Sequence, residues 1–384
     1  MLKVLELFGG IGACSKALER LGIEYEIADY VEIDKYAVKS FNAIHNTNFE
    51  PQDICEWDKD IEVDLIMHGS PCQDFSLAGK QAGGDKDSGT RSSLMYETIR
   101  IVSKLKPKYV IWENVKNLLS KKHRHNFDAY LETMEQLGYT NYYQVLNAKD
   151  YGIPQNRERV FTISIRNDSK PCVNEWFPSA VFYDETIDFE FPPKQELKLE
   201  LKDMLEDEVD EQYYLTDSML KTYQREFGSK GKMQNKKCCD TLTASMGTGG
   251  GNVPLTVKEN SVYSETEKKL FTETGNIKRY INSDVVDEFK EGQMATTSFP
   301  NGYGHGPRTH DESICLNCID KPSVKQNSQI RKITPKECWR LMGFDDEDYE
   351  KASKVNSNTQ LYKQAGNSIV VNVLEAILRN LIKV

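Results

Sequence analysis

The 384-residue sequence lacks the features of membrane and secreted proteins. No apolar run approaches the ~18 residues needed to span a bilayer. The first residues, Met1 to Val4, lead straight into a strand-like segment, so we expect no signal peptide. The nine cysteines are an odd number without the spacing of a disulfide framework. A reducing cytoplasm is therefore the expected location, and no membrane partner is expected.

The sequence also has little that could bind a metal. Cys315 and Cys318 form a C-x-x-C pair, but a four-ligand zinc site needs a second pair. The adjacent cysteines Cys238 and Cys239 are poorly spaced for that role. The C-x-x-C pair does not open a helix after a strand either, which argues against a redox motif. We predict no metal site.

Basic residues are fewer than acidic ones, and the net charge is −10. The segment 184–211 contains twelve acids and three lysines, so it holds nearly all of the imbalance. Basic clusters follow at 221–237 and at 325–340. Each cluster is weak support for phosphate contacts, because charged runs are usually solvated faces. Net charge thus does not exclude a nucleic-acid partner.

Hydrophobic periodicity, by contrast, is strong up to about residue 167. Buried-strand patterns cover 2–8, 25–31, 64–67, 109–112, 142–146 and 159–165, and helical patterns cover 13–21, 36–45, 92–106 and 126–137. This alternation predicts an open α/β sheet that is mostly parallel. The regular alternation then stops until Thr334, Pro335 and Glu337, which form a capping-box helix start. The closing segment from Gln364 to Ile369 is expected to start a last apolar helix that runs through Leu381. We therefore expect a domain over 1–167, an irregular domain over 168–329, and a segment over 330–384 that returns to the first.

A glycine turn follows the first strand. Gly9, Gly10 and Gly12 separate a strand from a helix, as in nucleotide-cofactor sites, where the backbone approaches the ligand closely. Ser15 stands where a dinucleotide fingerprint has its third glycine, so the pattern alone is weak. Glu32 ends the second strand, roughly twenty residues past the turn, where an acid can bind ribose hydroxyls.

Another polar turn contains Asp53. Its carboxylate could contact a purine amine or simply cap the turn. Both roles remain open from the residues alone.

The strand over 64–67 ends abruptly in Gly69-Ser70-Pro71-Cys72. Ligands of open α/β sheets bind beyond the carboxyl ends of strands, so Cys72 is presented to a cleft. The alternative is that Cys72 is a small buried hydrophobe, as most free cysteines are. The residues up to Gly89 have the Gly, Ser and Asp content of a loop.

Glu113 ends the next strand at the same edge. A carboxylate there is unfavourable unless it is paired or protonated, so Glu113 is either a catalytic acid or half of a salt bridge. Arg157 and Arg159 alternate at the start of a later strand and should project the same way. Ordinary surface arginines are the alternative for this pair.

These motifs, in this order, resemble those of the DNA (cytosine-5) methyltransferase family of bacteria and phages over about 1–166 and 331–379. The resemblance implies a Rossmann-like S-adenosylmethionine-dependent domain with a mostly parallel, doubly wound sheet, and a smaller irregular target-recognition domain. It implies S-adenosyl-L-methionine as the cofactor. The implied cofactor contacts are Phe8, Gly9, Gly10, Gly12, Glu32, Ile33, Asp53, Ile54, Pro71, Asn367 and Ser368.

The same resemblance implies the catalytic residues. Cys72 would add to C6 of a cytosine flipped out of double-stranded DNA, and Glu113 would act at N3. Arg159, and secondarily Arg157, would bind O2. The stretch from Cys72 to about Arg91 would close over the base. The implied DNA contacts are Gln73, Ser76, Lys80, Thr241 and Leu242.

Three alternatives are less favoured. An RNA (tRNA) cytosine-5 methyltransferase would not need the long insertion over 168–329. A catalytically silent DNA- or cofactor-binding homologue would not need Cys72, Glu113 and the arginine pair. A dehydrogenase is disfavoured by Ser15. We expect a monomer, with a restriction endonuclease of the same host as a functional rather than physical partner. The DNA target cannot be deduced from the sequence.

Overall fold

The structure is a computed structural model. It describes residues 1–71, 94–167, 171–173, 181–183, 189–214, 238–244, 246, 255–257, 294–295 and 330–382. The chain divides into two compact units. Unit 1 comprises Met1–Leu146, Glu158–Pro193 and Val373–Val384, and unit 2 comprises Asn147–Arg157 and Lys194–Asn372.

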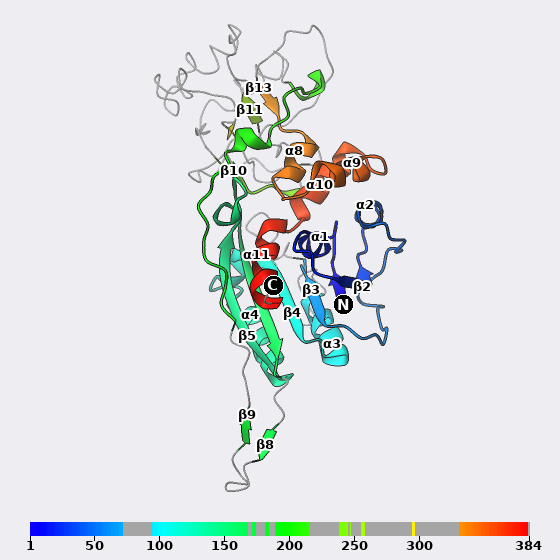
Figure 1. The fold of residues 1–384 in the computed structure, drawn as a ribbon, viewed down its shortest axis with the longest axis vertical. Helices are drawn as coiled ribbons and strands as arrows, with labels where there is room; N and C mark the ends of the chain where they lie inside the picture. The colour runs from blue at the N-terminus through cyan, green and yellow to red at the C-terminus, as the bar shows by residue number, and fades with distance from the viewer. Residues whose placement is uncertain are drawn as a thin grey trace. The chain divides into compact units, whose positions relative to one another are not determined.

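Unit 1 is built on a six-stranded sheet with the order β2-β1-β3-β4-β7-β5 (Figure 1). Its strands are β1 (Leu2–Leu7), β2 (Tyr25–Val31), β3 (Leu65–His68), β4 (Tyr109–Val115), β5 (Tyr139–Asn147) and β7 (Glu158–Arg166). β1 pairs in parallel with β2 and β3, and β3 pairs in parallel with β4. β4 pairs antiparallel with β7. The mostly parallel α/β sheet predicted from the sequence is confirmed.

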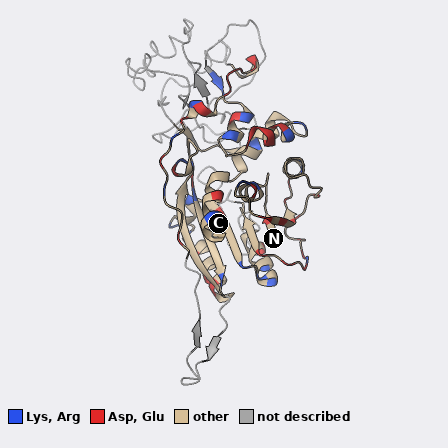
Figure 2. Cartoon of the chain, viewed as in Figure 1, with Lys and Arg blue, Asp and Glu red and all other residues tan. Residues whose placement is uncertain are grey.

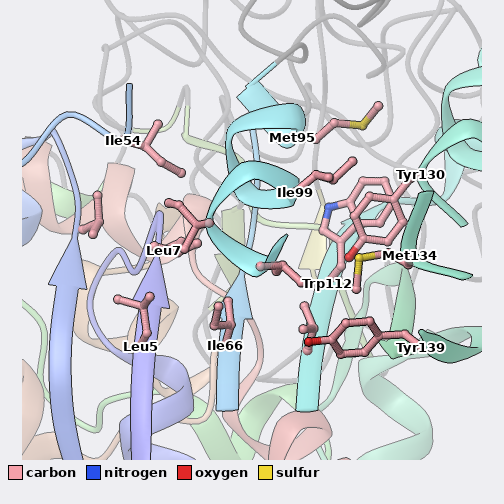
Figure 3. Packing of buried hydrophobic residues seen from close by; sticks show 14 of the residues in the cluster. Leu5, Leu7, Ile54, Ile66, Met95, Ile99, Trp112, Tyr130, Met134 and Tyr139 are labelled. Carbon is pink, nitrogen blue, oxygen red and sulfur yellow. The ribbon is translucent and has the colours of Figure 1, made fainter. Parts of the chain in front are cut away.

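Helices cover both faces of this sheet. They are α1 (Ala13–Arg20), α2 (Lys35–His45), α3 (Met95–Leu105) and α4 (Arg124–Gln136), with a 3₁₀ turn η2 (Lys116–Leu119) after β4. Alternate strand residues point to opposite faces. Leu7, Ile66 and Trp112 pack on one face against α3 and α4 (Figure 3). Glu6 faces the other way, toward Ser15 of α1.

Local signals set the ends of these helices. α2 begins where the side chain of Asp34 accepts the N–H of Tyr36, and it ends at Asn46 in the left-handed conformation with a φ of 54°. α3 ends at Lys106, also left-handed, and Pro107 prevents its continuation. Turn chemistry therefore accounts for all three of these helix boundaries.

Unit 2 contains short strands and the C-terminal helices. β6 (Gln155–Asn156) pairs in parallel with β10 (Cys239–Asp240). β11 (Leu255–Val257) lies between β12 (Met294–Ala295) and β13 (Ile330–Lys332). The helices are α8 (Pro335–Arg340), α9 (Asp346–Ser353), α10 (Asn358–Asn367) and the start of α11 (Val371–Ile382), preceded by 3₁₀ turns η3 (Ala148–Tyr151), η4 (Leu201–Met204) and η5 (Glu211–Tyr213). In unit 1, β8 (Pro171–Val173) and β9 (Val181–Tyr183) form a separate antiparallel pair.

The predicted capping box is present at the start of α8. Thr334 accepts the N–H of Glu337, and the Glu337 side chain accepts the N–H of Thr334. Glu337 also forms a buried ion pair with Arg331 at 2.7 Å. Figure 2 shows most of the sheet strands in the colour of uncharged residues, with a few charged positions, whereas α8 and α9 carry both signs of charge over much of their length. Among the described helices, none has the length and apolar character needed to cross a membrane.

Candidate active site

The glycine turn after β1 adopts backbone conformations that favour glycine. Gly10 and Gly12 have φ values of +57° and +82°. A Cβ on Gly9 would lie 2.6 Å from the ring of Tyr30, and one on Gly12 would lie 2.2 Å from the imidazole of His45. A Cβ on Gly10 would meet nothing within 4 Å. The turn is therefore tightly packed at Gly9 and Gly12 and open at Gly10.

Glu32 holds this turn from the end of β2. Its carboxylate accepts the N–H of Gly10 at 3.1 Å and the N–H of Asp34 at 2.8 Å. The hydroxyl of Tyr30 donates to the carbonyl of Gly10 at 2.6 Å. Burial raises the pKa of Glu32, and the two N–H donors oppose that effect. A carboxylate has about four acceptor positions, so Glu32 keeps capacity for ligand hydroxyls.

Glu6 explains why serine can stand at position 15. The buried carboxyl of Glu6 accepts both the N–H of Ser15, at 3.0 Å, and its hydroxyl. This contact ties the first turn of α1 to β1 directly behind the glycine turn. Ser15 thus provides a fixed polar contact at the place where a third glycine would provide close packing.

The other predicted cofactor residues of unit 1 have different environments. Ile33, just after β2, is 68% exposed, which is unusual for a large apolar side chain. Asp53 caps its turn by accepting the N–H of Cys55 at 2.9 Å. Ile54 is buried in the core cluster, and Phe8 packs partly buried against the same cluster. Ile33 is the member of this set that offers apolar surface to a ligand.

Ser70 anchors the chain just before the predicted nucleophile. The indole N–H of Trp112 donates to the hydroxyl of Ser70 at 2.9 Å. The amide of Asn114 donates to the carbonyl of Ser70 at 3.3 Å. β4 therefore holds the chain that leaves β3 at two atoms, one residue before Pro71. The predicted residues Cys72, Gln73, Ser76 and Lys80 lie outside the described residues.

Glu113 and Arg159 meet on neighbouring strands. The Nε atom of Arg159 lies 3.0 Å from Oε1 of Glu113, and both side chains are largely buried. The pair lies at the carboxyl end of β4, where Val115 opposes Arg159 in the antiparallel register. The salt bridge that the sequence allowed for Glu113 is therefore present, and its partner is the other catalytic candidate.

His68, the last residue of β3, is unsuited to acid–base chemistry. It is fully buried, and its ring stacks on Trp112 with centroids 5.6 Å apart. Burial lowers the pKa of His68 to about 3. The imidazole therefore stays neutral and acts as part of the core.

Arg157 lies in unit 2, with different partners from Arg159. Its guanidinium donates to the carbonyls of Leu242, Gly366 and Ser368. Thr241 is partly buried and Leu242 is buried beside it. Asn367 is exposed at the end of α10, whereas Ser368 is buried. The two arginines that the sequence paired thus belong to different units.

Sequence reasoning missed three residues that organise these sites. Gln155, which is fully buried, accepts the N–H of Leu242 at 3.2 Å. Ser70 and Trp112 form the anchor described above. Trp112 carried a usable signal, because a buried indole N–H usually requires a partner at hand. Gln155 is part of the Gln155-x-Arg157-x-Arg159 pattern that resembles the family's arginine motif, but its residue type alone indicated no role, since glutamine is ordinarily exposed.

Comparison with known proteins identifies the family. The model of the C-5 cytosine-specific DNA methylase family matches residues 2–383. The chain belongs to this family. It is a DNA cytosine-5 methyltransferase, and the family's description, which names DNA, does not favour the RNA alternative.

Curated relatives match the methyltransferase along nearly its whole length. The orphan methyltransferase M.SPRI of Bacillus phage SPR is 33% identical over 99% of this chain and 97% of its own. The type II methyltransferase M2.ScrFI of Lactococcus lactis subsp. cremoris is 30% identical over 100% of this chain and 99% of its own.

Solved structures share the fold. The Dnmt2 methyltransferase of S. pombe has a TM-score of 0.61 at 19% identity, covering 100% of this chain and 99% of its own. A DNMT2 variant of Spodoptera frugiperda has a TM-score of 0.60 at 20% identity, covering 100% of both chains. The Rossmann-like methyltransferase fold predicted from the sequence is confirmed.

Proposed function

We propose that this methyltransferase modifies C5 of a flipped-out cytosine within a specific DNA sequence, using S-adenosyl-L-methionine and a covalent bond to Cys72. The observation that carries the proposal is the Glu113–Arg159 pair at 3.0 Å. It places an acid and a guanidinium together at the strand edge where Ser70 anchors the chain leading to Cys72. These are the groups that addition to a cytosine ring requires.

The glycine turn fits S-adenosyl-L-methionine. The space beside Gly10 is open, Glu32 keeps acceptor capacity for ribose hydroxyls, and Ile33 offers an apolar surface to an adenine. Asp53, Phe8 and Pro71 complete the contacts that we propose in unit 1. The resemblance adds Asn367 and Ser368. When bound, the cofactor supplies an electrophilic methyl group on a sulfonium.

The chemistry follows from the three side chains. The thiolate of Cys72 forms a bond to C6, which places electron density on C5 and O2. Glu113 supplies or holds a proton at N3, and Arg159 stabilises the charge at O2. The bound cofactor would supply its methyl group to C5 and leave as the neutral thioether. The C5 proton would then pass to solvent, and the C6–S bond would break to restore the thiolate of Cys72. A stacked cytosine cannot be reached in this way, so the base must leave the duplex.

Target selection is assigned to the middle of the chain. We propose that 168–329 is the target-recognition region and that Gln73, Ser76, Lys80 and Thr241 contact double-stranded DNA. Leu242, which the sequence also suggested as a DNA contact, is buried and instead anchors the turn that carries Thr241. We further propose that the enzyme is a cytoplasmic monomer. Relatives named both orphan and type II support either an independent enzyme or one paired with a restriction endonuclease.

The direct test maps 5-methylcytosine at base resolution after purified enzyme is incubated with unmethylated genomic DNA and S-adenosyl-L-methionine. We expect methylation confined to one short motif. A Cys72→Ala variant should give none while it still binds the cofactor. Methylation by that variant, or none by the wild-type enzyme, would overturn the mechanism or the function respectively.

A further inference from the structure

The peptide of Leu242 is held on both sides by the residues that precede β7. The side chain of Gln155 accepts its N–H at 3.2 Å, and Nη1 of Arg157 donates to its carbonyl at 2.9 Å. The hydroxyl of Thr241 donates to the carbonyl of Asn156 at 2.8 Å. Pairing of β10 with β6 continues this attachment. The Thr241–Leu242 turn is thus fixed by its backbone.

Arg157 also closes the end of α10. Its Nη2 atom donates to the carbonyl of Ser368 at 2.7 Å and to that of Gly366 at 3.3 Å. The last carbonyls of a helix lack partners within the helix, and a cation there is favoured by the helix dipole. The single guanidinium of Arg157 therefore joins the Thr241–Leu242 turn to the C-terminal end of α10.

Gly366 allows the two segments to approach this closely. A Cβ at position 366 would lie 2.1 Å from the carbonyl carbon of Thr243 and 2.3 Å from the nitrogen of Ala244. Both atoms belong to backbone, which cannot rotate away as a flexible side chain could. Only glycine at this position lets the end of α10 lie against the peptide that joins Thr243 to Ala244.

The environment of Arg157 differs from that of a group that binds substrate. Arg157 is 4% exposed, and both of its terminal nitrogens donate to backbone carbonyls. Leu242 is 1% exposed, so its side chain anchors the turn inside unit 2. Arg159, in contrast, directs its guanidinium at the carboxylate of Glu113.

We propose that Arg157 is a positioning residue: with Gln155 and Gly366 it fixes the Thr241–Ala244 turn, and so it sets DNA affinity and target choice. The inference rests on the proposed function, since it assumes that this turn serves recognition. Arg157 then takes no part in the chemistry at the cytosine, and Arg159 alone binds O2.

Three variants test this division. Arg157→Lys removes the guanidinium that bridges Leu242 and the end of α10. Gly366→Ala places a Cβ against the peptide that joins Thr243 to Ala244. Arg159→Lys is the matched control. For each variant we would measure KM for duplex DNA, the single-turnover rate at saturating DNA, and the ratio of methylation at the mapped motif to that at one-base variants. Circular dichroism and melting temperatures set the assay temperature below unfolding for each protein.

Arg157→Lys and Gly366→Ala should each raise KM and lower the selectivity ratio by about tenfold, the effect of ~1.4 kcal/mol. Their single-turnover rates should stay within about threefold of wild type. Arg159→Lys should instead lower the single-turnover rate and leave KM for DNA and the selectivity ratio close to those of wild type. The proposal fails if Arg157→Lys lowers the single-turnover rate as Arg159→Lys does, or if Gly366→Ala leaves KM and selectivity unchanged. A wild-type enzyme that methylates no DNA would instead refute the proposed function.

Discussion

Glu6 is a buried carboxyl whose ionisation opposes folding. Burial raises its pKa to about 7 from an ordinary 4.5, although Ser15 donates two hydrogen bonds to it. Between these two pH values the folded protein keeps a proton that the unfolded chain releases. The free energy of unfolding therefore falls as the pH rises through this range, and the loss persists above pH 7. The shift in the pKa of Glu6 corresponds to a loss of at most about 3 kcal/mol in the free energy of unfolding.

Glu6→Gln should remove this pH dependence, because glutamine stays uncharged and keeps an acceptor for the N–H of Ser15. Denaturant unfolding at pH 5 and pH 8 is the measurement. Relative to the variant, the free energy of unfolding of the wild type should fall by up to about 3 kcal/mol between pH 5 and pH 8. Glu24→Gln, at an exposed position, is the control and should leave the profile unchanged. Parallel profiles for wild type and Glu6→Gln would contradict the assignment.

The effect of Glu113→Gln on the methylation rate distinguishes a catalytic role of Glu113 from a purely structural role as the ion-pair partner of Arg159. Glu113→Gln keeps the shape of the side chain but cannot supply the proton at N3, so the single-turnover rate should fall by about 10² to 10⁴. Glu158→Gln is the matched control, since Glu158 lies on β7 beside Arg159 and pairs with exposed Lys116. If both variants slow the enzyme equally, Glu113 has no special role.

At the scale of elements, β3 and β4 are joined beyond their ladder by the Ser70–Trp112 hydrogen bond. Ser70→Ala leaves the buried indole N–H without its acceptor, which should lower the free energy of unfolding by about 1–3 kcal/mol. It should also reduce the methylation rate, because the chain leading to Cys72 is less well held.

A double-mutant cycle with Trp112→Phe isolates this bond from the packing lost with the indole. The two changes should be non-additive by about 1 kcal/mol in unfolding. Strict additivity would show that Ser70 and Trp112 contribute independently to the free energy of unfolding. Their hydrogen bond would then not hold the chain that leads to Cys72.

Elements with strong periodicity could be predicted from the sequence. β1 to β4 carry continuous apolar runs, and the α8 start carries a complete capping box. The antiparallel pairing of β4 with β7 could not be predicted, because a buried strand looks alike in either direction. α9 and α10 were not predicted, since their polar composition hides the short apolar face each one buries.

For the candidate site, the sequence narrows the possible roles where a residue type has few chemical uses. A cysteine and a glutamate at neighbouring strand ends, and a glycine turn, each have a narrow set of uses. Arg157 and Arg159 illustrate the limit, because identical side chains two positions apart have carbonyl and carboxylate partners respectively. Which partner an arginine meets depends on chain segments far away in the sequence, here 242 and 366–368.

At the scale of the whole molecule, a protein with a net charge of −10 has to bind a polyanion. Three members of the 325–340 basic cluster form ion pairs within unit 2. Arg331 pairs with Glu337 at 2.7 Å and Arg340 with Asp346 at 2.7 Å, and Lys336 lies between Asp346 at 3.1 Å and Glu350 at 3.5 Å. These side chains are already neutralised. Phosphate contacts are therefore expected from the other cluster, over 221–237, which lies outside the described residues.

The salt dependence of DNA binding tests this assignment. Each lysine that neutralises a phosphate contributes about −1 to the slope of log affinity against log salt concentration. Replacing Lys236 and Lys237 together by glutamine should make that slope shallower by about 2, measured by fluorescence anisotropy of a labelled duplex between 50 and 200 mM salt. Lys336→Gln, the control from the neutralised cluster, should leave it unchanged. The reverse result would mean that DNA displaces Asp346 from Lys336, and that the internal ion pairs of α8 and α9 open when the complex forms.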